Sequence, residues 1–202
     1  MSDARAERAA FYSEHLGEPL RVLPPQRGEE PPVEIFVFAP NDDRDHYKLV
    51  TSGVSDAEQP APPAVPASKR RVELILYLEK LDQDPGLVEL WPVALLRSVT
   101  RLPSKNAWLG EFKLAPLSTP PKPVTPSSKL TTPVLLPPMF DLDVFKKGLT
   151  LSDGRRVSFL WLDVLTTTEA GFLSGNGAQA LLRKFQEKQH SPLLDATRAS
   201  YV

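Results

Sequence analysis

Cysteine is absent from this chain of 202 residues. Its absence excludes disulfides, thiolate catalysis, iron–sulfur clusters and zinc sites built on cysteine. No stretch approaches the roughly 18 consecutive apolar residues that a membrane helix requires, and Met1 to Ala10 is charged where a secretory signal would be apolar. We therefore expect a protein without a membrane span, in a reducing cytoplasm.

An excess of positive charge is also lacking, because 24 Lys and Arg stand against 25 Asp and Glu, for a formal net charge of -1. Nucleic-acid binders need surplus cations to replace the counterions of the phosphates, so we expect no nucleic-acid partner. Proline is plentiful, with 22 residues. Because proline breaks helices and removes hydrogen-bond donors, this content predicts short elements with long connections.

Hydrophobic periodicity predicts the elements of secondary structure. The expected helices cover 3–16, 91–102 and 178–188, with a short helical turn at Glu169. The expected strands cover 33–38, 47–51, 72–78 and 108–114, followed by a hairpin of 149–151 with 157–165. Ser2 or Asp3 is expected to cap the first helix. The strand at 33–38 is apolar on both faces and should therefore be central.

Two proline-rich stretches, 57–68 and 115–133, interrupt these elements. Both lie between segments that resemble parts of one sheet, and no internal repeat is found. We interpret them as irregular loops within a single domain of residues 1–202.

A calcium loop is suggested by Asn41, Asp43 and Asp45 at loop positions 1, 3 and 5. The pattern then fails, because His46 replaces the required glycine and Ser52 stands where a bidentate glutamate should be. We expect a solvated acidic turn and no metal.

The run 175–180 matches the glycine pattern of dinucleotide-binding loops. That pattern should directly follow a strand, and the preceding strand is expected to end near Leu165. We therefore expect a helix start and no cofactor.

Nucleophilic catalysis has only a weak sequence signal. Residues 53–57 resemble a nucleophile elbow but lack its second glycine. The histidines are dispersed in three segments (His15, His46 and His190). A hydrolase with a spatially assembled Ser/His/carboxylate site stays an alternative. It requires His46 or His15 within hydrogen-bond reach of Ser52 or Ser55.

A candidate binding surface follows the predicted helix at 91–102. Asn106, Trp108 and Glu111 bring an amide, an aromatic ring and a carboxylate together there. In a strand, Glu111 either faces solvent by alternation or lines a groove. A carboxylate at the edge of a groove would favour a partner that carries Lys, Arg or His.

Short segments between Val33 and Arg198 resemble a known family in their order and spacing. They are the runs 46–56, 73–78, 91–92, 106–111 and 157–165, then Thr168-Glu169, Asn176-Gly177, Leu181-Leu182, Asp195 and Arg198. Together they are similar to the suppressor of fused domain.

This resemblance implies an α+β fold with its core at about 33–198, in which helices flank a central, mixed and mostly antiparallel sheet. It also implies a non-enzymatic protein-binding module without a cofactor. Animal members clamp an extended peptide between two lobes through an acidic and an aromatic residue. Glu111 matches the acidic position, and the aromatic position falls near Thr100.

Stand-alone bacterial members of the family are regarded as immunity proteins, so the resemblance implies a protein toxin as partner. A regulatory adaptor that sequesters a peptide by strand addition is a further alternative.

Overall fold

The computed structural model describes residues 3–80 and 90–202, and a single β-sheet runs through them. Its strands are β1 (Arg21–Leu23), β2 (Glu34–Phe38), β3 (Tyr47–Ser52), β4 (Val72–Leu78), β5 (Lys113–Leu114), β6 (Leu130–Leu136), β7 (Leu149–Thr150) and β8 (Arg156–Thr166). Its helices are α1 (Ala4–Leu16), α2 (Trp91–Thr100), α3 (Asp143–Lys147), α4 (Thr167–Asn176) and α5 (Ala178–Glu187). Short 3₁₀ turns are η1 (Val54–Asp56), η2 (Ala67–Lys69) and η4 (Pro103–Lys105).

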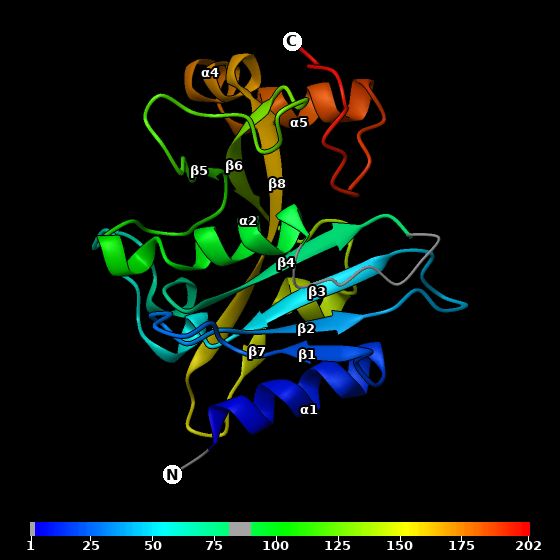
Figure 1. Ribbon diagram of the computed structural model, residues 1–202. Coiled ribbons are helices and arrows are strands. Elements are labelled where there is room, and N and C mark those ends of the chain that lie inside the picture. The colour runs from blue at the N-terminus through cyan, green and yellow to red at the C-terminus, as the bar shows by residue number, and fades with distance from the viewer. Residues whose placement is uncertain (1–2, 81–89) are drawn as a thin grey trace.

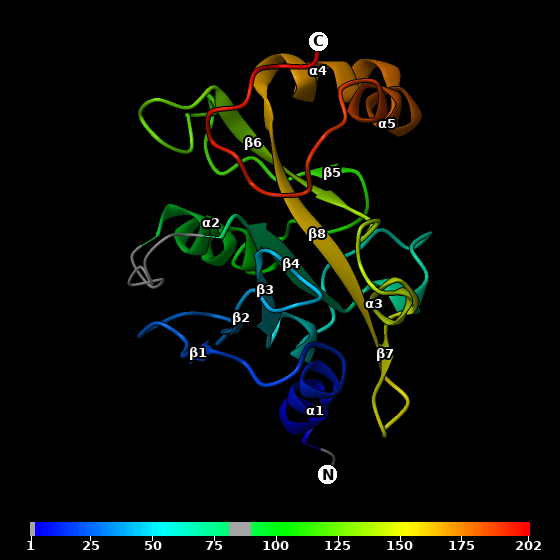
Figure 2. The ribbon, with the colours of Figure 1, turned by 90° about the vertical axis from the view of Figure 1, so that its right-hand side faces the viewer.

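The sheet has the order β1-β2-β3-β4-β8-β6-β5, with β7 paired to the start of β8. Only the β4–β8 pair is parallel among the described strands, and the others are antiparallel. The long strand β8 links a half formed by β1–β4 to a half formed by β5 and β6 (Figure 1; Figure 2). The expected α+β class and the mixed, mostly antiparallel sheet are confirmed.

Helices cover both faces of the sheet, so its inner strands carry apolar side chains on both faces. On β4, Leu74 and Leu76 belong to the core that also contains the buried side of α2. Ile75 and Tyr77 belong to the opposite core, which contains side chains of α1, α4 and α5. Every residue of β2 is buried, which confirms that the strand at 33–38 is an inner one.

Both ends of α1 follow the expected chemistry, whereas the short turn expected at Glu169 is a full helix, α4, whose cap is Thr166. The Asp3 carboxylate accepts from the amides of Arg5 and Ala6, and Gly17 ends α1 with φ 83°. Ser2, the alternative cap, lies outside the described residues. At α4, Thr166 and Glu169 form a reciprocal capping box.

The expected strand at 108–114 is wrong for most of its length. Only Lys113–Leu114 forms a strand, because Phe112 takes a left-handed conformation with φ 60°. The Lys113 amide donates to the Gly110 carbonyl and closes a turn. Glu111 therefore projects from a turn, where alternation between two faces does not apply.

The second proline-rich stretch is shorter than expected, because its end forms β6. Pro133 lies inside this strand, opposite Val164 of β8. The Pro133 carbonyl accepts from the Ala115 amide, so its ring nitrogen faces the short strand β5. Because proline has no amide hydrogen, β6 loses one backbone hydrogen bond to the two-residue edge strand β5. The hydrogen bonds between β6 and β8 are unaffected.

Two small elements, β1 and α3, are not predicted by periodicity. Both are too short for a repeat to be recognised, at three and five residues. The hairpin of β7 and β8 is confirmed, with Gly154 at φ 85° in its turn.

Candidate functional site

The turn after β3 encloses a buried carboxylate. Glu73 of β4 is 0% exposed and accepts from the Thr51 hydroxyl at 2.6 Å and from the Gly53 amide at 2.9 Å. It also accepts from the amide and hydroxyl of Ser55, at 3.1 and 2.6 Å. The Arg8 Nε of α1 lies 3.6 Å from the same carboxylate. We call this arrangement, Glu73 with Arg8, Thr51, Gly53 and Ser55, the Glu73 cluster.

The serines that could serve a hydrolase are engaged in this structural network. Ser52 accepts from Arg8 Nε at 2.9 Å, and Ser55 donates to Glu73. His46 pairs instead with Asp45 at 3.0 Å, and His15 packs edge-on against Phe11. Neither histidine makes a hydrogen bond to either serine, so the geometry required for that hydrolase is not met.

The C-terminal segment is held by two buried polar contacts. Arg198 donates to both carboxylate oxygens of Glu169, at 2.7 and 3.0 Å. Burial tends to raise the pKa of Glu169, but the bonds from Arg198 and the Thr166 amide outweigh it and lower that pKa. His190 lies 3.0 Å from Asp163 and bonds the Tyr201 hydroxyl at 2.9 Å. These residues anchor the chain end to β8 and α4.

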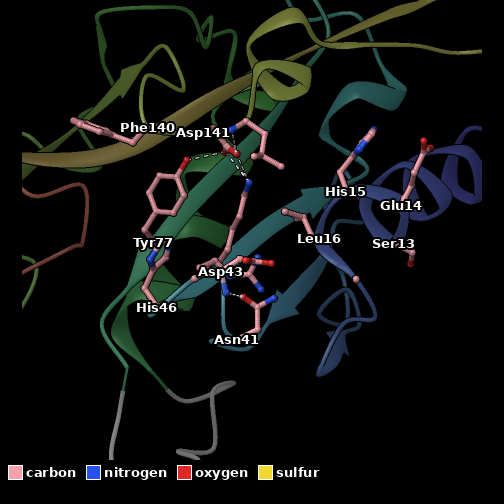
Figure 3. Close-up of a pocket in the computed structure, with 14 residues that line it drawn as sticks. Ser13, Glu14, His15, Leu16, Asn41, Asp43, His46, Tyr77, Phe140 and Asp141 are labelled. Carbon is pink, nitrogen blue, oxygen red and sulfur yellow. Dashed lines mark hydrogen bonds and ion pairs between the residues drawn. The ribbon is translucent and has the colours of Figure 1, made fainter.

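A cavity of about 570 Å³ lies between the end of α1, the turn at 41–46 and the loop at 140–142 (Figure 3). On its wall Lys48 donates to both oxygens of Asp141, at 2.6 and 2.7 Å. Tyr77 donates to the same carboxylate at 2.8 Å, and Figure 3 shows Tyr77 and Asp141 directed toward each other.

Burial shifts the pKa values of Lys48 and Tyr77, which line this cavity. Burial lowers the pKa of Lys48 to about 8, and Asp141 offsets only part of that shift. Burial and Asp141 both raise the pKa of Tyr77. A lysine of lowered pKa is a candidate nucleophile. Its side chain is only 3% exposed and is doubly bonded to Asp141, so the arrangement supports a structural role.

A second hollow lies at the proline-rich loop and brings together two of the predicted site residues. Trp108 and Glu111 line a cavity of about 300 Å³ with Pro66, Val72 and Leu160 among its other walls. An adjoining cavity of about 420 Å³ shares Lys69, Glu111 and Ser158 with the first. We call the two cavities together the groove, with an apolar half at Trp108 and a basic half beyond Glu111.

Local contacts fix the walls of the groove. The Gln59 side chain bonds both the amide and the carbonyl of Leu109, each at 2.8 Å, and ties the proline-rich loop to the Trp108 segment. Gly110 lies under the Trp108 ring, where an added Cβ would stand 2.4 Å from it. Glu111 pairs with Lys69 at 2.7 Å, and both side chains are well exposed at 40% and 53%.

The other two predicted residues lie elsewhere. Thr100 is 0% exposed and its hydroxyl donates to the Arg97 carbonyl, so it presents nothing to a partner. Asn106 is exposed, ends η4 with φ 62°, and does not line the groove. Lys69 was missed because its role depends on a fold contact with Glu111. Its position in a Pro/Ala-rich loop gives no sequence signal.

The motifs for metal and cofactor have structural explanations. The Asp43 amide donates to the Asn41 side chain in a local turn. Across 3–80 and 90–202, no cluster of three or more His, Asp or Glu side chains is arranged to hold a metal ion. Gly175 and Asn176 form the end of α4, and Gly177 separates α4 from α5, whereas a dinucleotide loop follows a strand. None of the described helices is long and apolar enough to cross a membrane.

Comparison with known proteins gives one family. The family described as "Suppressor of fused protein (SUFU)" matches residues 29–199. No curated protein matches the chain.

Solved structures share the fold. A putative SUFU homologue from Neisseria gonorrhoeae FA 1090 has a TM-score of 0.59 and 20% identity, with 98% of this chain and 93% of that chain covered. A chain of the Sufu–Fu complex has a TM-score of 0.68 and 14% identity, with coverages of 99% and 92%. Drosophila Suppressor of Fused has a TM-score of 0.57 and 15% identity, with coverages of 84% and 42%. Because the family match spans most of the sequence, this chain belongs to the suppressor of fused protein family.

Proposed function

We propose that the chain is a non-enzymatic protein-binding module that takes an extended segment of its partner in the groove. The observation that carries this proposal is the open apolar half at Trp108, which lies beside β5, the last strand at its end of the described sheet. The fold adds support, because a structure with the same fold is a complex of Sufu with Fu.

The residues in and near the groove would make different contacts with the partner. Trp108 lines the apolar half with an aromatic side chain, the kind that dominates binding energy at protein interfaces. Glu111 and Lys69 form an exposed pair at the junction of the two halves. Asn106 lies on the same segment outside the groove and would contact only a longer partner.

Gly110→Ala tests this site directly. The new methyl would displace the Trp108 ring, while the fold should persist because the ring lies at a partly exposed surface. Peptides are selected from a display library on the native protein, and their affinities are measured by fluorescence anisotropy for native and variant chains. We expect binding to weaken by at least about tenfold.

Gly175→Ala is the matched control, since a Cβ there has no atom within 4 Å. Trp108→Ala is the second variant and should weaken binding in the same way. If the native protein selects no peptide, or binds its peptides as well after either groove substitution, the groove is not the binding site.

The main chain of β5 offers a second mode of recognition. A partner segment would extend the sheet there by strand addition, which uses backbone hydrogen bonds. N-methylation of alternate amides in a selected peptide should then abolish its binding. Undiminished affinity of both N-methylated registers would exclude strand addition.

The finer proposal is that the partner is a protein toxin and that the chain acts as a cytoplasmic immunity protein. Its support is the likeness to the bacterial homologue, of which the chain covers 93%. A toxin encoded beside the gene is expressed in a bacterial host with and without this protein. Survival that requires the native protein and is lost with Gly110→Ala is expected. Death in both cases would reject that toxin as the partner.

A further inference from the structure

Basic side chains dominate the second half of the groove. They come from η2, from the end of α3 and from the start of β8: Lys69, Lys146, Lys147 and Arg156. Glu111 is the single carboxylate in the lining of this half. The whole chain has a formal net charge of -1, so this concentration of positive charge runs against the overall balance.

Two of these cations have no acidic partner among the residues that the structure describes. Lys69 is paired with Glu111 at 2.7 Å, and Lys146 with Asp143 at 3.3 Å. Arg156 donates to the Lys147 carbonyl at 2.9 Å. In the part of the chain that the structure describes, neither Lys147 nor Arg156 lies within ion-pair distance of a carboxylate. Both side chains are exposed and free to meet a ligand.

The charge of Glu111 is therefore already balanced by Lys69 before any partner arrives. A basic partner segment would replace Lys69 at Glu111 but would then meet Lys147 and Arg156 with like charge. An acidic segment would meet those two cations directly and leave the Lys69–Glu111 pair in place. This reverses the expectation, drawn from Glu111 alone, of a partner that carries Lys, Arg or His.

We infer that the groove recognises an acidic segment of a protein partner, with an apolar residue in the Trp108 half and Asp or Glu side chains against Lys147 and Arg156. The inference rests on the proposed function and specifies its partner. A single-stranded nucleic acid, whose bases can stack on an aromatic ring and whose backbone carries charge along its whole length, is the other occupant that the test includes.

The test uses the peptides selected on the native protein. We expect them to be enriched in Asp and Glu beside an apolar residue. The double substitution K147E/R156E should weaken their binding by at least about tenfold at low ionic strength, and by less at high salt because screening shortens the range of the charges. The matched control is R183E/K188E, which reverses two exposed charges on and just after α5.

Each other outcome has a definite reading. Peptides that depend on Gly110 and Trp108 but show no acidic enrichment would overturn the inference and leave the proposed function standing. An absence of any groove-dependent peptide would reject both. A fluorescent single-stranded oligonucleotide serves as a third probe. If it binds and is released by K147E/R156E while the peptides are unaffected, the basic half is a nucleic-acid surface and the inference fails.

Discussion

Two carboxylates, Glu73 and Glu111, show how burial changes what an ion pair does. Glu73 is fully buried and accepts four hydrogen bonds from residues of the β3 end, with Arg8 beside it. Glu111 is 40% exposed and has one cation partner. The bonds of Glu73 fix the turn after β3 to β4, whereas Glu111 can exchange Lys69 for a charged group of a partner. The same side chain therefore serves stability in one place and recognition in the other.

The difference also explains which sequence signals were informative. The run 51–56, part of the resemblance to the family, supplies the donors of the Glu73 cluster. Its serines, Ser52 and Ser55, are nucleophile candidates by sequence because small polar residues occur both in catalytic turns and around buried carboxylates. In the structure they bond Arg8 and Glu73.

Removing the buried carboxylate of Glu73 gives the largest expected effect on stability. Glu73→Ala leaves the hydroxyl and amide donors around this carboxylate without their acceptor. It also removes one of the two carboxylates beside the buried Arg8, which keeps Asp56 at 2.6 Å. We therefore expect the free energy of unfolding to fall by about 3 to 5 kcal/mol. Glu111→Ala, the control in the same protein, should change it by less than about 0.5 kcal/mol. Urea denaturation of the three proteins measures both values. Similar losses for the two variants would contradict the distinction between a structural and a surface pair.

A pH series examines a third polar site, Lys48 in the cavity near α1. Its folded-state pKa of about 8 lies below the ordinary value of 10.5, so the unfolded chain binds more protons between these values. The free energy of unfolding should therefore rise with pH through that window, by at most about 1.4 kcal/mol per pH unit. Below pH 8 the cost of burying the charged amine is present in full.

Lys48→Met should remove this rise, and Lys129→Met, at an exposed position, should keep it. The series is read between pH 7.5 and 9.5 by urea denaturation. The raised pKa values of Tyr12 and Tyr77 oppose the trend above about pH 10, where unfolded tyrosines ionise. An identical slope in native and Lys48→Met proteins would exclude Lys48 as its source.

The smallest expected effect is at Glu111 itself. Glu111→Lys removes the partner of Lys69 and adds a cation to the groove, so an acidic peptide should bind several-fold more tightly at low salt. Glu111→Gln should give a smaller increase, and neither should shift the melting temperature by more than about 2 °C. Anisotropy titrations with the selected peptides measure the change. Weaker binding to Glu111→Lys would instead favour direct recognition of a basic partner by Glu111.

Sequence patterns predicted the fold where a repeat is long enough to read. Examples are the amphipathic helix α2 and the strands β2, β4 and β8, which carry apolar residues on both faces of the sheet. The strand expected at 108–114 failed because Phe112 adopts a left-handed conformation that a bulky residue seldom takes. The sequence does not indicate the strand β6, because its first residues belong to the proline-rich stretch 115–133; in the structure the nitrogen of Pro133 faces only a short edge strand.

The site was predicted only in part, for a related reason. Trp108 and Glu111 are close in sequence, and their shared groove follows from that proximity. Lys69, Lys147 and Arg156 come from three distant segments, and only the pairing of β8 with β4 and the position of α3 bring them together. Charge at a surface has no periodicity, so the sequence gives no indication that these cations gather at one place.

The parallel pairing of β4 with β8 has a consequence for synthesis on the ribosome. The strands β1 to β4 are adjacent in the chain and can pair as soon as they emerge, but β4 then presents an open edge. Its partner β8 emerges only after residues 79–155, and an unpaired apolar edge is a template for wrong association during that interval. We expect the nascent chain to need shielding between these two points, and truncations that end before β8 to aggregate.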